Sequence, residues 1–332
     1  MQKITLTTCL IAFVFACSSA QQAEPKQTPV KSKSRLPANY KVPVKNKSFE
    51  GEGSRLILTA RRFAPGEAVL LQLESRDGKP CADCTIKLNG KEIPVVTLPS
   101  GGWGIAGIDP DEKKTEIELQ WQLEGLAVNS QILKIAKADF PVYHSTLNLG
   151  KYSEAGHEKK KESQDHLKLS WELKKNAYSQ SDANHLGGSF FHPRDQHKIT
   201  SPFWAKRVYA RYRVKDGKKE KLKPLERIHR GTDLRGFEGT PVYAMNKGRI
   251  ALAANLYYEG NFVLIDHGNK VYTGYMHLSR FEVQQGEIVE AGQLIGRCGS
   301  TGVVTAAHLH LFTMVHGVVI DGLSLLALTV PE

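Results

Sequence analysis

The sequence predicts a mainly β protein made of two folded parts. The chain has 332 residues, 41% of them hydrophobic and 24% charged, which allows two domains with substantial cores. Between residues 50 and 142, short alternating apolar and polar runs are separated by turn signals such as Asp77-Gly78 and Asn89-Gly90. Strands at this spacing are typical of an immunoglobulin-like β-sandwich. The last third of the chain again consists of short apolar runs joined by turns, which predicts a second domain of antiparallel β-sheet.

Residues 1–17 are predicted to be a secretory signal. Met1-Gln2-Lys3 precedes an apolar run to Ala16 that is too short to cross a membrane as a helix. Val14-Phe15-Ala16-Cys17 resembles a bacterial lipobox, which would make Cys17 the acylated first residue of the mature protein. The alternative is ordinary cleavage after Ala20, which would discard this cysteine. Both interpretations predict export, and we favour the lipid-anchored one.

Residues 18–49 are predicted to be a tether. They are rich in proline and lysine and show almost no apolar periodicity, which is typical of an extended linker. The positive charge is either that of a solvated linker or an attraction to an anionic wall or membrane surface. The formal net charge of +11 comes partly from this segment. Because no basic stripe interleaved with aromatic residues accompanies it, nucleic acid is not an expected partner.

The cysteines fit an exported protein. Cys81 and Cys84 form a Cys-x-x-Cys pair, and the sequence has no second pair that could complete a zinc site. A local disulfide is therefore predicted in preference to a redox or metal-binding role. Cys298 lies in an apolar context between glycines and is predicted to be a small buried side chain.

Residues 143–188 are predicted to connect the two domains. Residues 154–165 are rich in lysine and glutamate without an apolar face, which predicts a solvated loop or a short helix. Residues 167–173 alternate leucine and tryptophan with polar residues, which predicts a half-buried strand. Residues 182–197 are predicted to be a loop, and its three histidines lack the tight spacing of a metal site.

Three short strings in the last third of the chain carry most of the chemistry: His229-Arg230-Gly231-Thr232-Asp233, Tyr275-Met276-His277-Leu278 and His308-Leu309-His310. Catalytic zinc usually takes three protein ligands and leaves a fourth position for water. The three strings supply four histidines and one aspartate, which is two imidazoles more than the three ligands of one zinc. A hydrolytic site would use the two additional imidazoles for proton transfer and for stabilising an oxyanion. Residues 306–315 are predicted to form a strand, so the imidazoles of the third string should point to one face.

At these residues the sequence resembles the lysostaphin-type (LytM-type) zinc metallopeptidases, which are peptidoglycan endopeptidases. The resemblance implies that His229, Asp233 and His310 bind zinc, and that His277 and His308 are the catalytic pair. It does not divide the proton-transfer and oxyanion roles between these two. It covers roughly residues 190–328, and we place the LytM-type domain at 189–328. Further segments follow the family in order: 199–203, 239–244, 265–269, 292–296 and 299–302.

Some positions depart from the family pattern, but none is among the five site residues. Trp204 stands where the family usually has glycine, Gly322 stands where the family often has a proline after the aspartate (here Asp321), and Leu311-Phe312 stands where an aromatic-then-polar pair is usual. The stretch from Tyr209 to Arg227 is longer and more basic than usual, and Asp216-Gly217 within it predicts a hairpin. These differences bear on the shape of the groove and on substrate preference. In the first domain, residues 103–109 resemble the accessory domain that precedes some catalytic domains of the family.

The sequence thus predicts an exported zinc endopeptidase that is held at the outer membrane of a diderm envelope, in the periplasm, by a lipid on Cys17. The resemblance implies that the substrate is the peptide cross-link of peptidoglycan, and the family together with the predicted location points to its D-alanyl–diaminopimelate bond. Other cell-wall enzymes are candidate partners. One alternative is a non-catalytic LytM-type scaffold or amidase activator, against which the complete set of five residues argues. Another is a zinc peptidase that acts on protein substrates. Because no His-Glu-x-x-His helix offers a glutamate base, proton transfer would fall to an imidazole.

Overall fold

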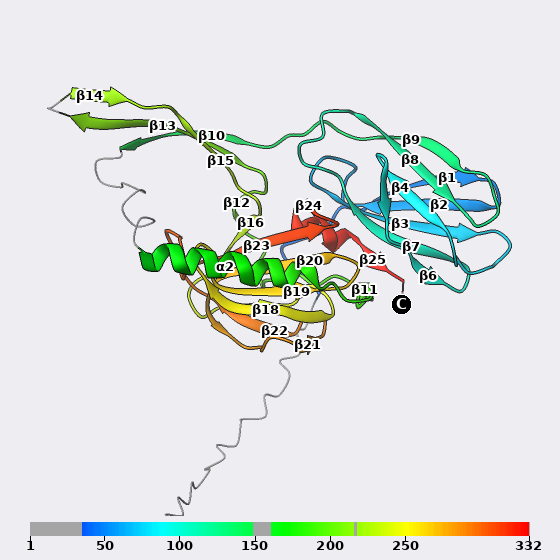
Figure 1. Cartoon of the computed structure of the whole chain (residues 1–332). Coiled ribbons are helices and arrows are strands. Elements are labelled where there is room, and N and C mark those ends of the chain that lie inside the picture. Colours follow the sequence, from blue (N-terminus) through cyan, green and yellow to red (C-terminus); the bar gives the residue numbers. More distant parts are fainter. Residues whose placement is uncertain (1–34, 149–160, 216–217, 332) are drawn as a thin grey trace, which may run out of the picture. The chain divides into compact units, whose positions relative to one another are not determined.

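The computed structural model describes residues 35–148, 161–215 and 218–331, and these are largely β-structure with one long helix (Figure 1). The predicted signal, the lipobox and the first part of the predicted tether lie outside the described residues. Strand β1 begins at Lys45, so the last residues of the segment predicted to be a tether belong to the folded part. Phe49 of this strand packs against a buried core. Among the described residues, no helix has the length and apolar character needed to cross a membrane.

Two antiparallel sheets form the predicted sandwich. Core residues of the first sheet, such as Leu58 and Leu71, pack in one cluster with Ile86 and Trp121 of the second. The immunoglobulin-like assignment stays a prediction. The first sheet has the order β1 (Lys45–Gly51), β2 (Ser54–Ala60), β3 (Ala68–Ser75), β7 (Gly101–Gly107) and β6 (Val96–Leu98), and the second has the order β5 (Lys91–Ile93), β4 (Thr85–Leu88), β8 (Glu116–Gln122) and β9 (Asn129–Lys134).

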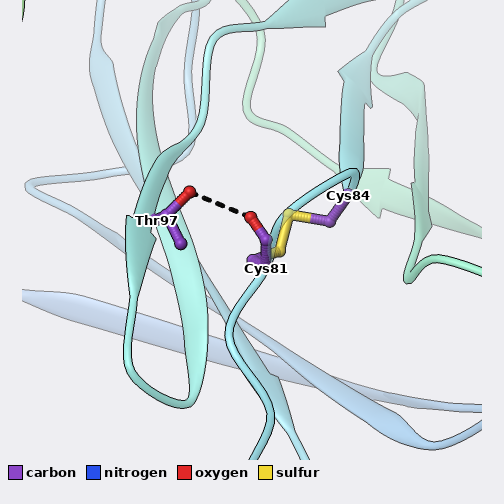
Figure 2. Close-up of a disulfide and its surroundings, with 3 residues drawn as sticks. All are labelled: Cys81, Cys84 and Thr97. Atoms are coloured by element: carbon purple, nitrogen blue, oxygen red, sulfur yellow. Dashed lines mark hydrogen bonds between the residues drawn. A yellow bond between two sulfur atoms is a disulfide. The ribbon is translucent and has the colours of Figure 1, made fainter.

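The Cys81–Cys84 pair is bridged by a disulfide, as predicted, with a Cα–Cα distance of 5.3 Å (Figure 2). The carbonyl of Cys81 accepts a hydrogen bond of 2.9 Å from the hydroxyl of Thr97, so the bridge is tied to β6. The prediction for Cys298 is also confirmed, because this thiol is fully buried in the core of the second part.

The second part is built on a ten-stranded sheet, and its antiparallel character is confirmed. Strands β19 and β20 form an antiparallel hairpin around His267. The sheet has the order β12 (Ile199–Ser201), β16 (Thr232–Arg235), β23 (His308–Val315), β20 (Val271–Phe281), β19 (Gly260–Asp266), β18 (Gly248–Leu256) and β21 (Ile288–Val289), with β17 (Pro241–Tyr243), β22 (Leu294–Cys298) and β24 (Val318–Val319) attached. A 3₁₀ helix (Gly322–Ala327), β25 (Thr329–Val330) and its partner β11 (Gly188–Ser189) complete this part.

The two faces of this sheet have different coverings. On β23, Leu309, Leu311 and Val315 point into the larger core, while Met314 on the opposite face joins a smaller apolar cluster. Helix α2 (Lys161–Ser179) contributes Ala177 to that smaller cluster and packs on β18. On β23, the side chains of one face are therefore buried, and those of the other face are only partly covered.

The half-buried strand predicted for residues 167–173 is wrong, because these residues lie inside α2. The alternation of Leu169 and Trp171 with polar residues does not reflect burial, since these two side chains are 51% and 67% exposed. The buried positions are Ser170 and Ala177, seven residues apart and thus on one helix face, and most of the remaining residues favour a helix. The buried positions of this segment therefore follow the 3.6-residue period of an α-helix and not the two-residue period of a strand.

A separate four-stranded sheet contains the basic stretch. It joins β10 (Val142–Asn148) in parallel to β13 (Lys206–Lys215), which pairs antiparallel with β14 (Lys218–Lys221) and β15 (Leu225–Ile228). The pairing of Lys215 with Lys218 confirms the predicted hairpin, although its turn residues 216–217 lie outside the described residues. Strand β15 leads directly to His229.

Candidate metal centre

His229, Asp233 and His310 converge at one point of the ten-stranded sheet, with their potential ligand atoms within 4.8 Å of one another. Oδ1 of Asp233 lies 3.0 Å from Nε2 of His229 and 2.8 Å from Nδ1 of His310, and the two nitrogens are 3.1 Å apart. Three ligands at zinc–ligand distances of about 2.0–2.2 Å in a tetrahedral site would be roughly 3.3 Å from one another. The three atoms are therefore spaced as ligands of one small cation.

Strand register brings two of these ligands together. Asp233 on β16 is the direct partner of His310 on β23, so both side chains project from the same face at the same level. His229 joins them from the segment before β16, where its backbone exchanges hydrogen bonds with Trp204 and Ala205. Gly231 makes the approach possible, because a Cβ atom at this position would lie 2.4 Å from Nε2 of His310.

The surroundings of the ligands suit a divalent cation. Nδ1 of His229 donates a hydrogen bond of 2.9 Å to the carbonyl of Pro202, which leaves its Nε2 lone pair directed at the cluster. Burial tends to raise the pKa of Asp233, but the imidazole nitrogens of His229, His308 and His310 around this carboxylate hold it well below its usual range. Two neutral imidazoles and one carboxylate are a donor set that zinc binds readily, so the residues present fit this metal.

His277 reaches the same face through a β-bulge. Its neighbour Met276 already points toward the smaller cluster, so regular alternation would turn His277 toward the opposite core. Instead, Met276 and His277 together oppose Phe262 of β19, and His277 has a left-handed backbone with φ of 64°. The bulge is what directs a second imidazole toward the metal ligands.

His277 and His308 stand side by side, with ring centroids 5.0 Å apart. The His277 ring is also 6.0 Å from that of His310. Nδ1 of His277 donates to the carbonyl of Thr301 at 2.9 Å, and Nδ1 of His308 donates to that of Ala306 at 2.8 Å. Each ring is thereby held in one orientation, with its Nε2 directed away from the bonded carbonyl, and Nε2 of His308 lies 3.4 Å from Oδ1 of Asp233.

The two rings differ electrostatically. Burial lowers the pKa of His277 to about 4, so this imidazole is neutral at pH 7. Burial acts in the same direction on His308, but its hydrogen bond to Asp233 and the charge of that carboxylate outweigh it and raise the pKa of His308. The pair therefore combines one weakly basic and one more basic imidazole beside the three ligands.

The remaining histidines discussed above lie apart from this cluster. His267 is fully buried and bonds the carbonyl of Lys247 and the hydroxyl of Thr273, which is a structural role. In the 182–197 segment, His185 bonds Asp182, and His192 bonds His197 at 3.1 Å. The five residues singled out from the sequence are thus brought to one site, while their individual roles stay a prediction.

Comparison with known proteins places the site in a recognised domain. Residues 227–322, which include all five site residues, match Peptidase family M23. Over 89 residues the chain is 46% identical to the peptidoglycan DD-endopeptidase ShyA of Vibrio cholerae, a match that covers 27% of this chain and 21% of ShyA. Over 91 residues it is 45% identical to lysostaphin of Staphylococcus staphylolyticus, covering 27% of this chain and 19% of lysostaphin. The chain thus spans about a fifth of the length of these curated relatives.

A solved structure extends the likeness in fold. A crystal structure from Pseudomonas aeruginosa, described as a peptidase M23, superposes with a TM-score of 0.55 over 80% of this chain and 96% of that one. At 19% sequence identity this similarity concerns the fold alone. The similarity in fold nevertheless extends well beyond the segment that matches in sequence.

Proposed function

Because residues 227–322 form a peptidase family M23 domain, we propose that this chain is a zinc endopeptidase that hydrolyses the peptide cross-links of bacterial peptidoglycan. The observation that carries the proposal is the convergence of three ligand atoms within 4.8 Å, with two further imidazoles beside them. The similarity to enzymes named for peptidoglycan endopeptidase activity supports the substrate class.

His229, Asp233 and His310 would hold the zinc, which when bound supplies a Lewis acid for the scissile carbonyl and its attacking water. Nε2 of His277 or His308 takes the proton as the water oxygen bonds to the carbonyl carbon. The other imidazole, which takes a proton from solvent on its Nε2 before the reaction and keeps it throughout, donates a hydrogen bond to the tetrahedral oxyanion. The proton then passes to the amine as the carbon–nitrogen bond breaks, so one water is consumed and no other reactant is needed.

The proposed location is the periplasm, with a lipid on Cys17 holding the protein at the membrane and the basic segment that follows acting as a tether. Support for this comes from the sequence pattern alone. Labelled fatty acid should enter the wild-type protein in cells and should not enter the Cys17→Ala variant. Equal labelling of the two would refute the anchor, and absence of label from both would favour cleavage after Ala20.

The decisive experiment for the function is product analysis from purified sacculi. Wild-type protein with one zinc should convert cross-linked peptide dimers to monomers, each cut releasing a D-alanyl carboxylate and a diaminopimelate amine. Asp233→Ala should release none, because two imidazoles alone hold zinc poorly. Intact dimers after digestion with zinc-loaded wild type would contradict the proposed function, and products cut at another bond would reassign the substrate bond.

A further inference from the structure

Arg235 lies beside His308 on the face that carries the metal ligands. On β16, Thr232 and Leu234 point into the buried core, whereas Asp233 and Arg235 point the other way. Asp233 is paired with His310, and Arg235 is paired with His308 in the same register. Directly opposite residues of antiparallel strands are about 4.5–5.5 Å apart at Cα, so the Arg235 side chain emerges alongside the His308 imidazole.

The Arg235 guanidinium is exposed and makes no ion pair with a carboxylate of the described residues. Its one described side-chain contact is with the ring of Phe237, which lies 5.7 Å from the guanidinium carbon and is 71% exposed. Arg207, whose positive charge acts on His308, differs because it donates a hydrogen bond of 2.8 Å to the hydroxyl of Ser201. Arg235 is therefore an exposed cation next to His308 in the sheet register, in contact with an aromatic ring and without a carboxylate partner among the described residues.

The guanidinium group matches the planar geometry of a carboxylate and binds it through two parallel hydrogen bonds. The cross-links of peptidoglycan differ in whether such a group is present at the bond that is cut. In a D-alanyl–diaminopimelate link, the amide nitrogen is attached to a carbon that also bears a free carboxylate. That carboxylate is close to the scissile carbonyl, within reach of an arginine next to His308. The internal amides of a glycine bridge carry no such group.

We propose that Arg235 binds the free carboxylate on the leaving-amine side of the scissile bond and thereby selects cross-links that carry it. This inference rests on the proposed function, which it extends by naming the residue that distinguishes one class of cross-link from another. Arg235 is thus a specificity-determining residue, not a zinc ligand or a proton carrier.

The test uses two cross-linked peptide dimers that differ only in whether the carboxylate next to the scissile amide is free or amidated. Wild type should cleave the free form with the higher kcat/KM. Arg235→Gln should lose about 10- to 100-fold in kcat/KM on the free form, mainly through KM, as is typical of losing a charge-assisted hydrogen bond. On the amidated form it should match wild type. Arg235→Lys, which keeps the charge without the planar fork, should fall between the two on the free form.

Arg55→Gln is the matched control, since it removes the same charge from an exposed arginine of β2 in the sandwich and should leave both rates unchanged. Zinc content, measured for every variant, should stay near one per chain. Equal losses by Arg235→Gln on the two dimers, or no loss on either, would overturn the role of Arg235 while leaving the proposed function intact. A zinc-loaded wild type that cleaves neither dimer would refute the proposed function, and this inference with it.

Discussion

Gly231 lies against the side chain of His310, and replacing it with alanine should remove the metal without removing a ligand. The new Cβ would lie 2.4 Å from Nε2 of His310 and 2.6 Å from the carbonyl oxygen of Leu311. Relief of the two contacts requires residue 231 to separate from His310 and from the Leu311 carbonyl by up to roughly 1 Å, and such overpacking typically costs about 1–3 kcal/mol. The ligand atoms are 2.8–3.1 Å apart, which leaves no room for that shift while all three bind one ion.

The expected result is zinc affinity at least about 100-fold below wild type, with a folded protein, because two remaining ligands make a poor site. Competition with a chromophoric chelator measures the affinity, and thermal unfolding in chelator measures the stability of the metal-free fold. Gly239→Ala is the matched control. Its Cβ would meet open space, but its φ of 81° makes alanine strained, so it should lower stability by about 1–2 kcal/mol and leave zinc affinity unchanged. Wild-type zinc affinity in Gly231→Ala would refute the close packing on which this reasoning depends.

Three further predictions follow from individual residues. His308→Ala and His277→Ala should each keep near-stoichiometric zinc and lose at least about 100-fold in turnover, whereas His310→Ala should lose both zinc and activity. Metal analysis and cleavage of the cross-linked dimers, measured on each variant, check this. Near-wild-type cleavage by His308→Ala would show that the roles are misassigned. Burial lowers the pKa of His267 to about 4, below the value near 6.5 of the unfolded chain, so the unfolded state gains a proton first and stability falls as the pH drops from about 6.5 to 4. This group alone should make unfolding about 2 kcal/mol easier at pH 5 than at pH 7, and denaturant titrations of His267→Gln should show a correspondingly weaker pH dependence if the assignment is right. The exported protein should have an intact mass two hydrogens below that of its reduced form, because Cys81 and Cys84 are bridged; two thiols alkylated without reduction would contradict the disulfide.

The sequence was sufficient for features that depend on local periodicity. The period of two in the residues around His308 and His310 places both imidazoles on one face, and the alternation in β23 bears this out. The same rule failed for residues 167–173. There, leucine and tryptophan alternate with polar residues by coincidence. The tertiary contacts are made by Ala177, which packs with apolar residues of β18, and by Ser170, whose hydroxyl accepts a hydrogen bond from the backbone N–H of Tyr257. Alternation of apolar and polar residues over only seven residues does not exclude a helix, because some of the apolar side chains can lie on its solvent-exposed face.

Features that depend on pairing between distant strands could not be derived from residue patterns. The closeness of Asp233 and His310 follows from the register of β16 and β23, which are far apart in the chain, and only the family resemblance indicated it. The bulge at His277 inserts a residue into β20 and reverses the face expected from alternation. Arg235 carried no signal in the sequence, because its position beside His308 appears only once that register is known.

The position of the bound metal tests the central claim most directly. A crystal of the zinc-loaded protein, measured on both sides of the zinc absorption edge, locates the ion independently of any assumed ligand. We expect one zinc per chain, bonded to His229, Asp233 and His310 at about 2.0–2.2 Å, with His277 and His308 nearby and not bonded. Zinc at another place in the chain, or these three side chains more than about 6 Å apart with zinc present, would contradict the account.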